Sequence, residues 1–195
     1  MNARMLSQTA TATLRILLFR AGPQDFPYAR EMVGVLPAAA IAAYTAVFAA
    51  FLSIGAALLI SALSVGTLAL VTHSLLTARR LANRFQQTYH ALLATGIVLT
   101  LASIPPTITL APALKQILAH PELLQQPDAL QVSPLASLLL NALNLWNFAV
   151  YAHIFRHAAD TRLFIGVLIA VFVGFSVLFL SLLFAQMLSP LLKIG

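Results

Sequence analysis

The sequence predicts an all-α membrane protein, a bundle of five transmembrane helices with the N-terminus in the cytoplasm and the C-terminus outside. Composition is the first reason: 61% of the 195 residues are hydrophobic and 8% are charged, whereas soluble domains carry about 25% charged residues. The second reason is that apolar residues occur in runs of about 20, which as helices cross the ~30 Å hydrocarbon layer of a bilayer. The third reason, the placement of arginines, sets the orientation.

Five apolar runs separated by short polar links are the predicted spans. They cover residues 32–52, 55–78, 88–108, 134–155 and 163–188. The first two form a hairpin with a turn near Ser53, and Ser133 is placed to cap the fourth span with Pro134 in its first turn. Pro105 and Pro106 each lack a backbone donor, so we expect the third helix to kink or end near the outer face.

The basic residues are distributed unevenly along the chain. The arginines precede the first span or lie in the links after spans two and four, whereas Lys115 and Lys193 do not. Cytoplasmic loops of membrane proteins carry an excess of basic residues, which predicts an N-in, C-out orientation. We expect the following arginines to contact anionic lipid headgroups on the cytoplasmic side: Arg15, Arg20, Arg79, Arg80, Arg84, Arg156 and Arg162.

Three regions follow from these spans. Residues 1–31 are predicted to form a cytoplasmic interfacial helix, with Leu14, Leu17 and Leu18 in apolar surroundings, and then an elbow rich in proline and aromatic residues. In the elbow, Phe26 and Tyr28 are expected at headgroup depth. The membrane domain covers residues 32–188, with an outer loop at 110–133 in which "APALKQILAH" forms a short surface helix, and 189–195 is an outer tail.

Small residues recur every fourth position in three spans. They are Ala38, Ala42, Ala46 and Ala50 in the first span, Ala57 with Ser61 and Ala62 with Gly66 in the second, and Gly166, Ala170 and Gly174 in the fifth. This spacing lets helix backbones approach closely in lipid. We expect these faces to pack inside the bundle; a docking face for another membrane subunit is the alternative.

A polar stripe runs along the fourth span, "SPLASLLLNALNLWNFAVYAH". At 100° per residue its members fall within about one third of the helix circumference; they are Ser137, Asn141, Asn144, Asn147 and Tyr151. Such a stripe is costly against lipid, so it faces the bundle interior or a partner. We expect interhelical hydrogen bonds worth about 0.6 kcal/mol each; a polar groove for a small solute or a lipid headgroup is the alternative.

The sequence contains no pattern that indicates catalysis. Cysteine is absent, and no recognisable nucleotide-binding, hydrolase or metalloprotease motif occurs. Acidic residues lie at span ends or in loops, which argues against a proton-coupled pump; they are Asp25, Glu31, Glu122, Asp128 and Asp160. We therefore predict no catalytic residues and no enzymatic activity.

Four histidines cluster near the predicted cytoplasmic face: His73, His90, His153 and His157. Neutral imidazoles on facing helices can ligate haem or a metal ion, which makes a redox subunit an alternative. Histidines at headgroup depth are commonly just amphipathic helix ends. We expect no metal and no cofactor.

The predicted topology resembles that of the Yip1-type membrane proteins, which have five spans, a cytoplasmic N-terminus and short links after spans two and four. The "DLYGP"-like motif of that family does not occur here, so no functional residue is carried over. The segments "LRILLFRAGPQDFPY", "RFQQTYHALLATG" and "LWNFAVYAHIFRHA" are also similar to uncharacterised small inner-membrane proteins of Gram-negative bacteria. The resemblance implies a bacterial inner membrane and no particular activity.

Together these observations predict a non-enzymatic inner-membrane component for assembly, scaffolding or trafficking that acts through helix and lipid contacts. One alternative is a small transporter or channel subunit that uses the polar stripe, and another is the haem- or metal-binding redox subunit. The expected partners are anionic lipids and either a membrane protein or a second copy of the chain. Nucleic acid is not an expected partner, because the positive charge lies where lipid headgroups are.

Overall fold

The computed structural model describes residues 3–27, 31–125 and 130–188, and these ranges contain helices and no strand. A first helix, α1 (Ala3–Leu17), precedes five helices of the bundle: α2 (Met32–Phe48), α3 (Ile54–Ala78), α4 (Phe85–Ala119), α5 (Pro134–Ala158) and α6 (Leu163–Leu188). Short 3-10 turns lie at η1 (Pro23–Asp25), η2 (Ala82–Arg84) and η3 (Pro121–Gln125). The all-α prediction is therefore confirmed.

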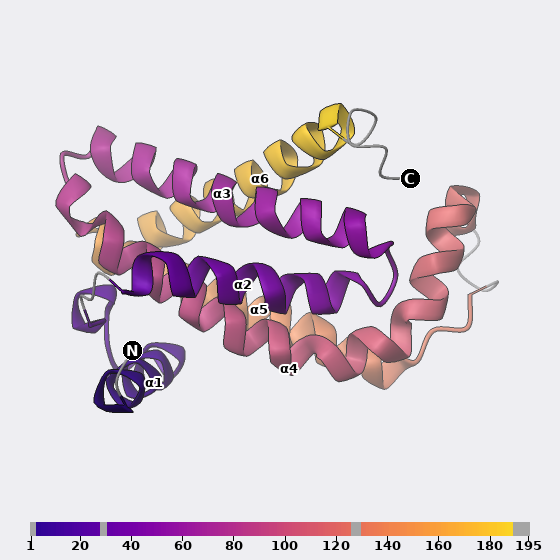
Figure 1. Ribbon diagram of the computed structural model, residues 1–195, viewed down its shortest axis with the longest axis horizontal. Coiled ribbons are helices and arrows are strands. Elements are labelled where there is room, and N and C mark those ends of the chain that lie inside the picture. The colour runs from indigo at the N-terminus through magenta and orange to yellow at the C-terminus, as the bar shows by residue number, and fades with distance from the viewer. Residues whose placement is uncertain (1–2, 28–30, 126–129, 189–195) are drawn as a thin grey trace.

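The five bundle helices pack in a ring. Helix α2 contacts α3 and α4, α5 contacts α4 and α6, and α6 closes the ring against α3. Helix α1 lies across one end of this bundle, where Figure 1 shows it almost end-on while the other helices run along the long axis. The α3–α4 and α5–α6 connections lie at the same end, which we call the arginine-rich end.

Four segments are long and apolar enough to cross a membrane: α3, the segment Ala82–Ala119, α5 and α6. Helix α2 is also apolar but has 17 residues, about 26 Å at 1.5 Å per residue. It ends four residues before the end of the predicted span, because residues 49–52 form turns. In these turns the Leu52 N–H donates to the Phe48 carbonyl at 2.8 Å. The chain then enters α3, whose N-cap Ser53 accepts from the Ala56 N–H.

The predicted spans two, four and five agree closely with α3, α5 and α6. Ser133 caps α5 as predicted, since its Oγ accepts from the Ala136 N–H at 3.3 Å. The third span is different: α4 continues through Pro105, Pro106 and Pro112, and Figure 1 shows it bending before its C-terminal part. Proline removes backbone bonds but keeps a helical φ, so it bends this helix rather than ending it. The predicted separate surface helix is thus wrong, because its residues are the last turns of α4.

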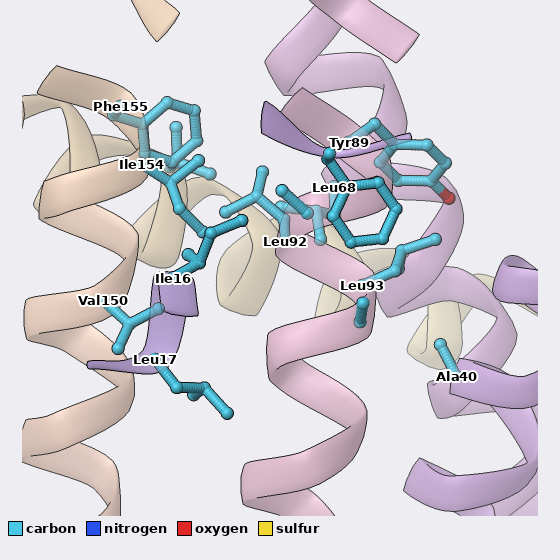
Figure 2. Close-up of a cluster of buried hydrophobic side chains, with 14 of the residues drawn as sticks. Ile16, Leu17, Ala40, Leu68, Tyr89, Leu92, Leu93, Val150, Ile154 and Phe155 are labelled. Carbon is cyan, nitrogen blue, oxygen red and sulfur yellow. The ribbon is translucent and has the colours of Figure 1, made fainter. Parts of the chain in front are cut away.

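The densest core lies toward the arginine-rich end, between α1, α4 and α5. In Figure 2, Ile16 of α1 lies close to Ile154 of α5 and on the side of Leu92 of α4, whereas Leu17 lies lower in the view, near Val150 of α5. Ile16, Leu92 and Ile154 are fully buried, as are the neighbouring Leu93, Val150 and Phe155. This core fixes α1 to the bundle and contains Leu17. Leu14 and Leu18 are exposed on the protein surface, so their predicted apolar surroundings at the membrane interface stay a prediction.

Part of the elbow, including Phe26, is buried in the protein. Phe26 is 1% exposed and lies 6.4 Å from the His90 ring, centroid to centroid. Phe26 therefore packs against the protein rather than serving as an anchor in lipid, since the elbow folds back onto α4 and α5; its depth in the membrane stays a prediction. Tyr28, the other residue of that prediction, lies outside the described residues.

The small-residue faces divide into packed and outward-facing ones. Ala57, Ser61, Gly166 and Ala170 are buried as predicted. Ala38, Ala42, Ala46 and Ala62 are exposed, and a Cβ on Gly66 or Gly174 would meet nothing within 4 Å. Packing of these faces inside the bundle was predicted and is wrong: α2 instead turns Met32, Ala40 and Ala43 inward, because a helix with small residues on several sides can bury any of them.

Candidate functional site: a polar cavity within the bundle

A cavity of about 340 Å³ lies between α2, α3, α4 and α5, on the side of the core away from the arginine-rich end. We call it the polar cavity. Its polar lining consists of Tyr44, Ser64, Thr100, Ser103, Thr107, Asn144 and Asn147, and its apolar lining of Val47, Phe48, Phe51, Leu114 and Leu140. Polar groups from all four helices therefore line one hollow in the bundle, which is open on one side.

Helix α5 brings part of the predicted polar stripe to this cavity. Asn144 and Asn147 line it, and the buried Oδ1 of Asn147 has no hydrogen-bond partner in the described part of the chain. Asn144 is exposed, so the cavity opens to the surface beside it. Asn141 is exposed as well but is not among the lining residues, and Ser137 is half-buried nearer the start of the helix. Tyr151 lies deeper, near Gly96 and Tyr44.

The interhelical hydrogen bonds expected for the stripe do not form at its asparagines. Within residues 3–27, 31–125 and 130–188, the side chains of Asn141, Asn144 and Asn147 make no hydrogen bond to a neighbouring helix. An unpaired buried polar group costs roughly 1–3 kcal/mol. Two of the five stripe residues, Asn144 and Asn147, therefore face the cavity rather than a partner on another helix, whereas Tyr151 makes the expected interhelical bond, to Tyr44 of α2.

Helix α4 supplies a second polar face that the sequence analysis missed. Thr100, Ser103 and Thr107 follow one another at three and four residues, so they share a side of the helix. The Ser103 hydroxyl donates to the Thr100 carbonyl at 2.7 Å, which leaves its lone pairs for a ligand. The spacing was visible in the sequence, but hydroxyls that bond their own helix are common in spans and gave no reason to single it out.

Two tyrosines border the cavity on the side of the core. A side-chain hydrogen bond joins Tyr44 and Tyr151, and Gly96 of α4 makes room for it. A Cβ at Gly96 would lie 2.7 Å from the Tyr44 hydroxyl and 3.5 Å from the Tyr151 hydroxyl. Beyond this pair, residues 91–95 of α4 are buried. The cavity is thus separated from the arginine-rich end by the tyrosine pair and by packed core.

The lining of the polar cavity is uncharged. It contains hydroxyl, phenol and amide groups and neither acidic nor basic side chains. Acids lie at the helix ends, where Asp25 accepts from the Gly22 N–H at 2.9 Å and Glu122 is 3.2 Å from His120; Asp128 lies outside the described residues. Because a buried ion without a partner charge is costly, this lining suits a neutral molecule that forms hydrogen bonds.

The four histidines do not converge on one site. His153 and His157 share a face as expected, with ring centroids 4.6 Å apart, and His153 Nε2 is 2.9 Å from the Ala21 carbonyl oxygen. His90 is buried near Phe26, whereas His73 is exposed and packs edge-on against Phe85. In the part of the chain that the structure describes, no group of three or more histidine or acidic side chains could hold a metal ion.

The predicted headgroup arginines belong to elements at the arginine-rich end (Figure 1). Most are exposed: Arg15, Arg20, Arg79, Arg80, Arg156 and Arg162. Arg84 instead has a structural contact, since its Nη1 donates to the carbonyls of His157 and Ala158 at 3.3 and 3.2 Å. It thereby caps the C-terminal end of α5, where cations are favoured.

Comparison with models of protein families, with curated proteins and with solved structures finds no match for this chain. The fold and the apolar helices define a multi-pass α-helical membrane protein.

Proposed function

We propose that this protein binds an uncharged, hydrogen-bonding small molecule in the polar cavity and acts as a small transporter or channel subunit. The observation that carries the proposal is the buried, unpartnered Oδ1 of Asn147 in a cavity also lined by Asn144 and by hydroxyls. Polar groups at membrane depth without protein partners are expensive, so their presence indicates a ligand or solute path.

The proposal includes a membrane arrangement. Helix α2 acts as a fifth, short span beside the four longer ones, with the arginine-rich end in the cytoplasm of a bacterial cell. A short span is accommodated by thinning of the bilayer or by its neighbours at a modest cost. In this arrangement the polar cavity lies in the outer half of the membrane, and Tyr44 and Tyr151 separate it from the cytoplasm.

The scaffold or assembly role is the second candidate. One observation favours it: the small residues Ala38, Ala42 and Ala46 of α2 face outward rather than into the bundle. A partner helix could approach closely at such a face. A purely structural role, however, leaves the polar cavity without a purpose, and we therefore place it second.

Solute uptake by proteoliposomes tests the proposal. Swelling in gradients of urea or glycerol is followed by light scattering for the wild type and for Asn144→Leu, Asn147→Leu and Asn141→Leu. We expect the wild type to accelerate uptake of at least one neutral solute. In the two cavity variants this acceleration should fall about tenfold, equivalent to the loss of one hydrogen bond of ~1.4 kcal/mol. Their melting temperatures in detergent should stay at or above that of the wild type.

Asn141→Leu is the matched control, because Asn141 is on the same helix but does not line the cavity. It should leave uptake unchanged. Equal losses in all three variants, or a wild type that accelerates neither solute, would contradict the proposal and favour the scaffold role.

A further inference from the structure

A second hollow lies on the outside of the bundle, between α3 and α6. Figure 1 shows these two helices crossing, and a groove of about 600 Å³ runs between them. Its walls are mostly apolar and include Leu70, Ile169 and Phe172. Leu70 and Phe172 are each 58% exposed, so the groove opens outward, toward lipid in the membrane.

One end of this α3–α6 groove is basic. Arg79, the C-cap residue of α3, lines it together with Ile165 from the first turn of α6. Both lie at the arginine-rich end, at the level where helices leave the membrane. The hydroxyls of Ser74 and Ser176 also line the groove, and no acidic residue does.

We infer that the α3–α6 groove binds an anionic phospholipid, with an acyl chain along the apolar walls and the phosphate at the Arg79 guanidinium. Charge complementarity at Arg79 selects this occupant. Lipid tails are as apolar as the groove walls, so the walls accept any acyl chain without preference. Selectivity between lipids therefore comes from the net charge of the headgroup. A guanidinium binds any lipid phosphate through paired, charge-assisted hydrogen bonds, but in phosphatidylcholine the choline cation offsets the phosphate, whereas an anionic phospholipid keeps its net negative charge for Arg79.

The neighbouring Arg80 shows that position matters as well as charge. It follows Arg79 directly, but its φ of 60° turns the backbone into the left-handed region, and it is not among the residues lining the groove. Both arginines are exposed. Substitution of Arg80 therefore measures the general attraction of a basic surface for anionic lipids, whereas substitution of Arg79 measures binding in the groove.

Tryptophan quenching by brominated lipids measures this binding directly. The chain has one tryptophan, so Trp146→Phe combined with Phe172→Trp places a single reporter in the groove wall. The protein is reconstituted in mixtures of phosphatidylcholine with brominated phosphatidylglycerol or brominated phosphatidylcholine. We expect phosphatidylglycerol to bind beside the reporter about fivefold more strongly than phosphatidylcholine, equivalent to ~1 kcal/mol for one basic residue.

In the same reporter background, Arg79→Gln should reduce this preference to near one, and Arg80→Gln should leave it at about fivefold. Circular dichroism and melting temperature show whether each variant remains folded. Equal quenching by the two lipids in the Arg79-containing protein would overturn the inference. Equal loss in Arg79→Gln and Arg80→Gln would also overturn it, because the preference would then belong to the whole basic surface.

Discussion

The contact between α5 and α6 depends on a single missing side chain. A Cβ at Gly166 would lie 2.6 Å from the Ala152 carbonyl oxygen and 2.8 Å from Arg156 Cβ. The first neighbour is backbone, so Gly166→Ala forces the two helices apart by about 0.8 Å to reach ordinary contact at 3.4 Å. A gap of that size forfeits roughly a quarter to a half of the dispersion energy of atoms facing it, including those of Ala170 and Val173.

Gly174→Ala is the matched substitution on the same helix. A Cβ at Gly174 would meet nothing within 4 Å. Both substitutions gain the same helix propensity, up to about 1 kcal/mol, so this term cancels in the comparison. The remaining difference is the overpacking cost, and we expect Gly166→Ala to be less stable than Gly174→Ala by about 1–3 kcal/mol.

Unfolding by dodecyl sulfate in mixed micelles measures the two free energies. The fluorescence of Trp146 is a suitable signal, because its ring lies 5.4 Å from that of Phe19 and loses this neighbour when the elbow detaches. Indistinguishable free energies of unfolding for the two variants would refute the reasoning, since they would show that α5 and α6 do not touch at Gly166.

Three further predictions concern topology, the tyrosine pair and the cap of α5. The chain has no cysteine, so single cysteines can be labelled with an impermeant thiol reagent. Ser7→Cys and Asp160→Cys should be labelled from the cytoplasm, and Ser53→Cys and Lys115→Cys from outside. Labelling of Ser7→Cys from outside would contradict the five-span arrangement. Tyr44→Phe should cost ~0.6 kcal/mol of unfolding free energy. Gly96→Ala should be better tolerated by about that amount in the Tyr44→Phe background than in the wild type, because the added Cβ then displaces no hydroxyl and the gain in helix propensity cancels; the same effect of Gly96→Ala in both backgrounds would show that the two residues do not act on the same bond. Arg84→Gln should lower the free energy of unfolding by about 1 kcal/mol, because the two hydrogen bonds to the α5 carbonyls are lost. Arg80→Gln should leave the free energy of unfolding unchanged. Equal effects of the two substitutions would show that net charge, and not the cap of α5, causes the loss.

Much of the architecture was predictable from the sequence because hydropathy acts locally. Runs of apolar residues near 20 specify helices in a bilayer regardless of what they pack against, so α3, α5 and α6 begin and end close to the expected residues. The cap at Ser133 was predictable for the same reason, since it depends on residues within one turn. The polar stripe could also be recognised from the 3.6-residue period alone.

Tertiary structure decided the rotation of each helix, the bend of α4 and what the polar stripe faces. Whether Gly166 or Gly174 touches a neighbour depends on which way α6 is turned, and small residues on every side of a helix leave that choice to packing. A proline pair permits both a kink and a helix end, and α4 continues because its later turns still contact the bundle. The stripe could have met a partner helix or a cavity. Asn144 and Asn147 face a cavity that residues of four helices line together, and that arrangement is a property of long-range packing rather than of any one segment.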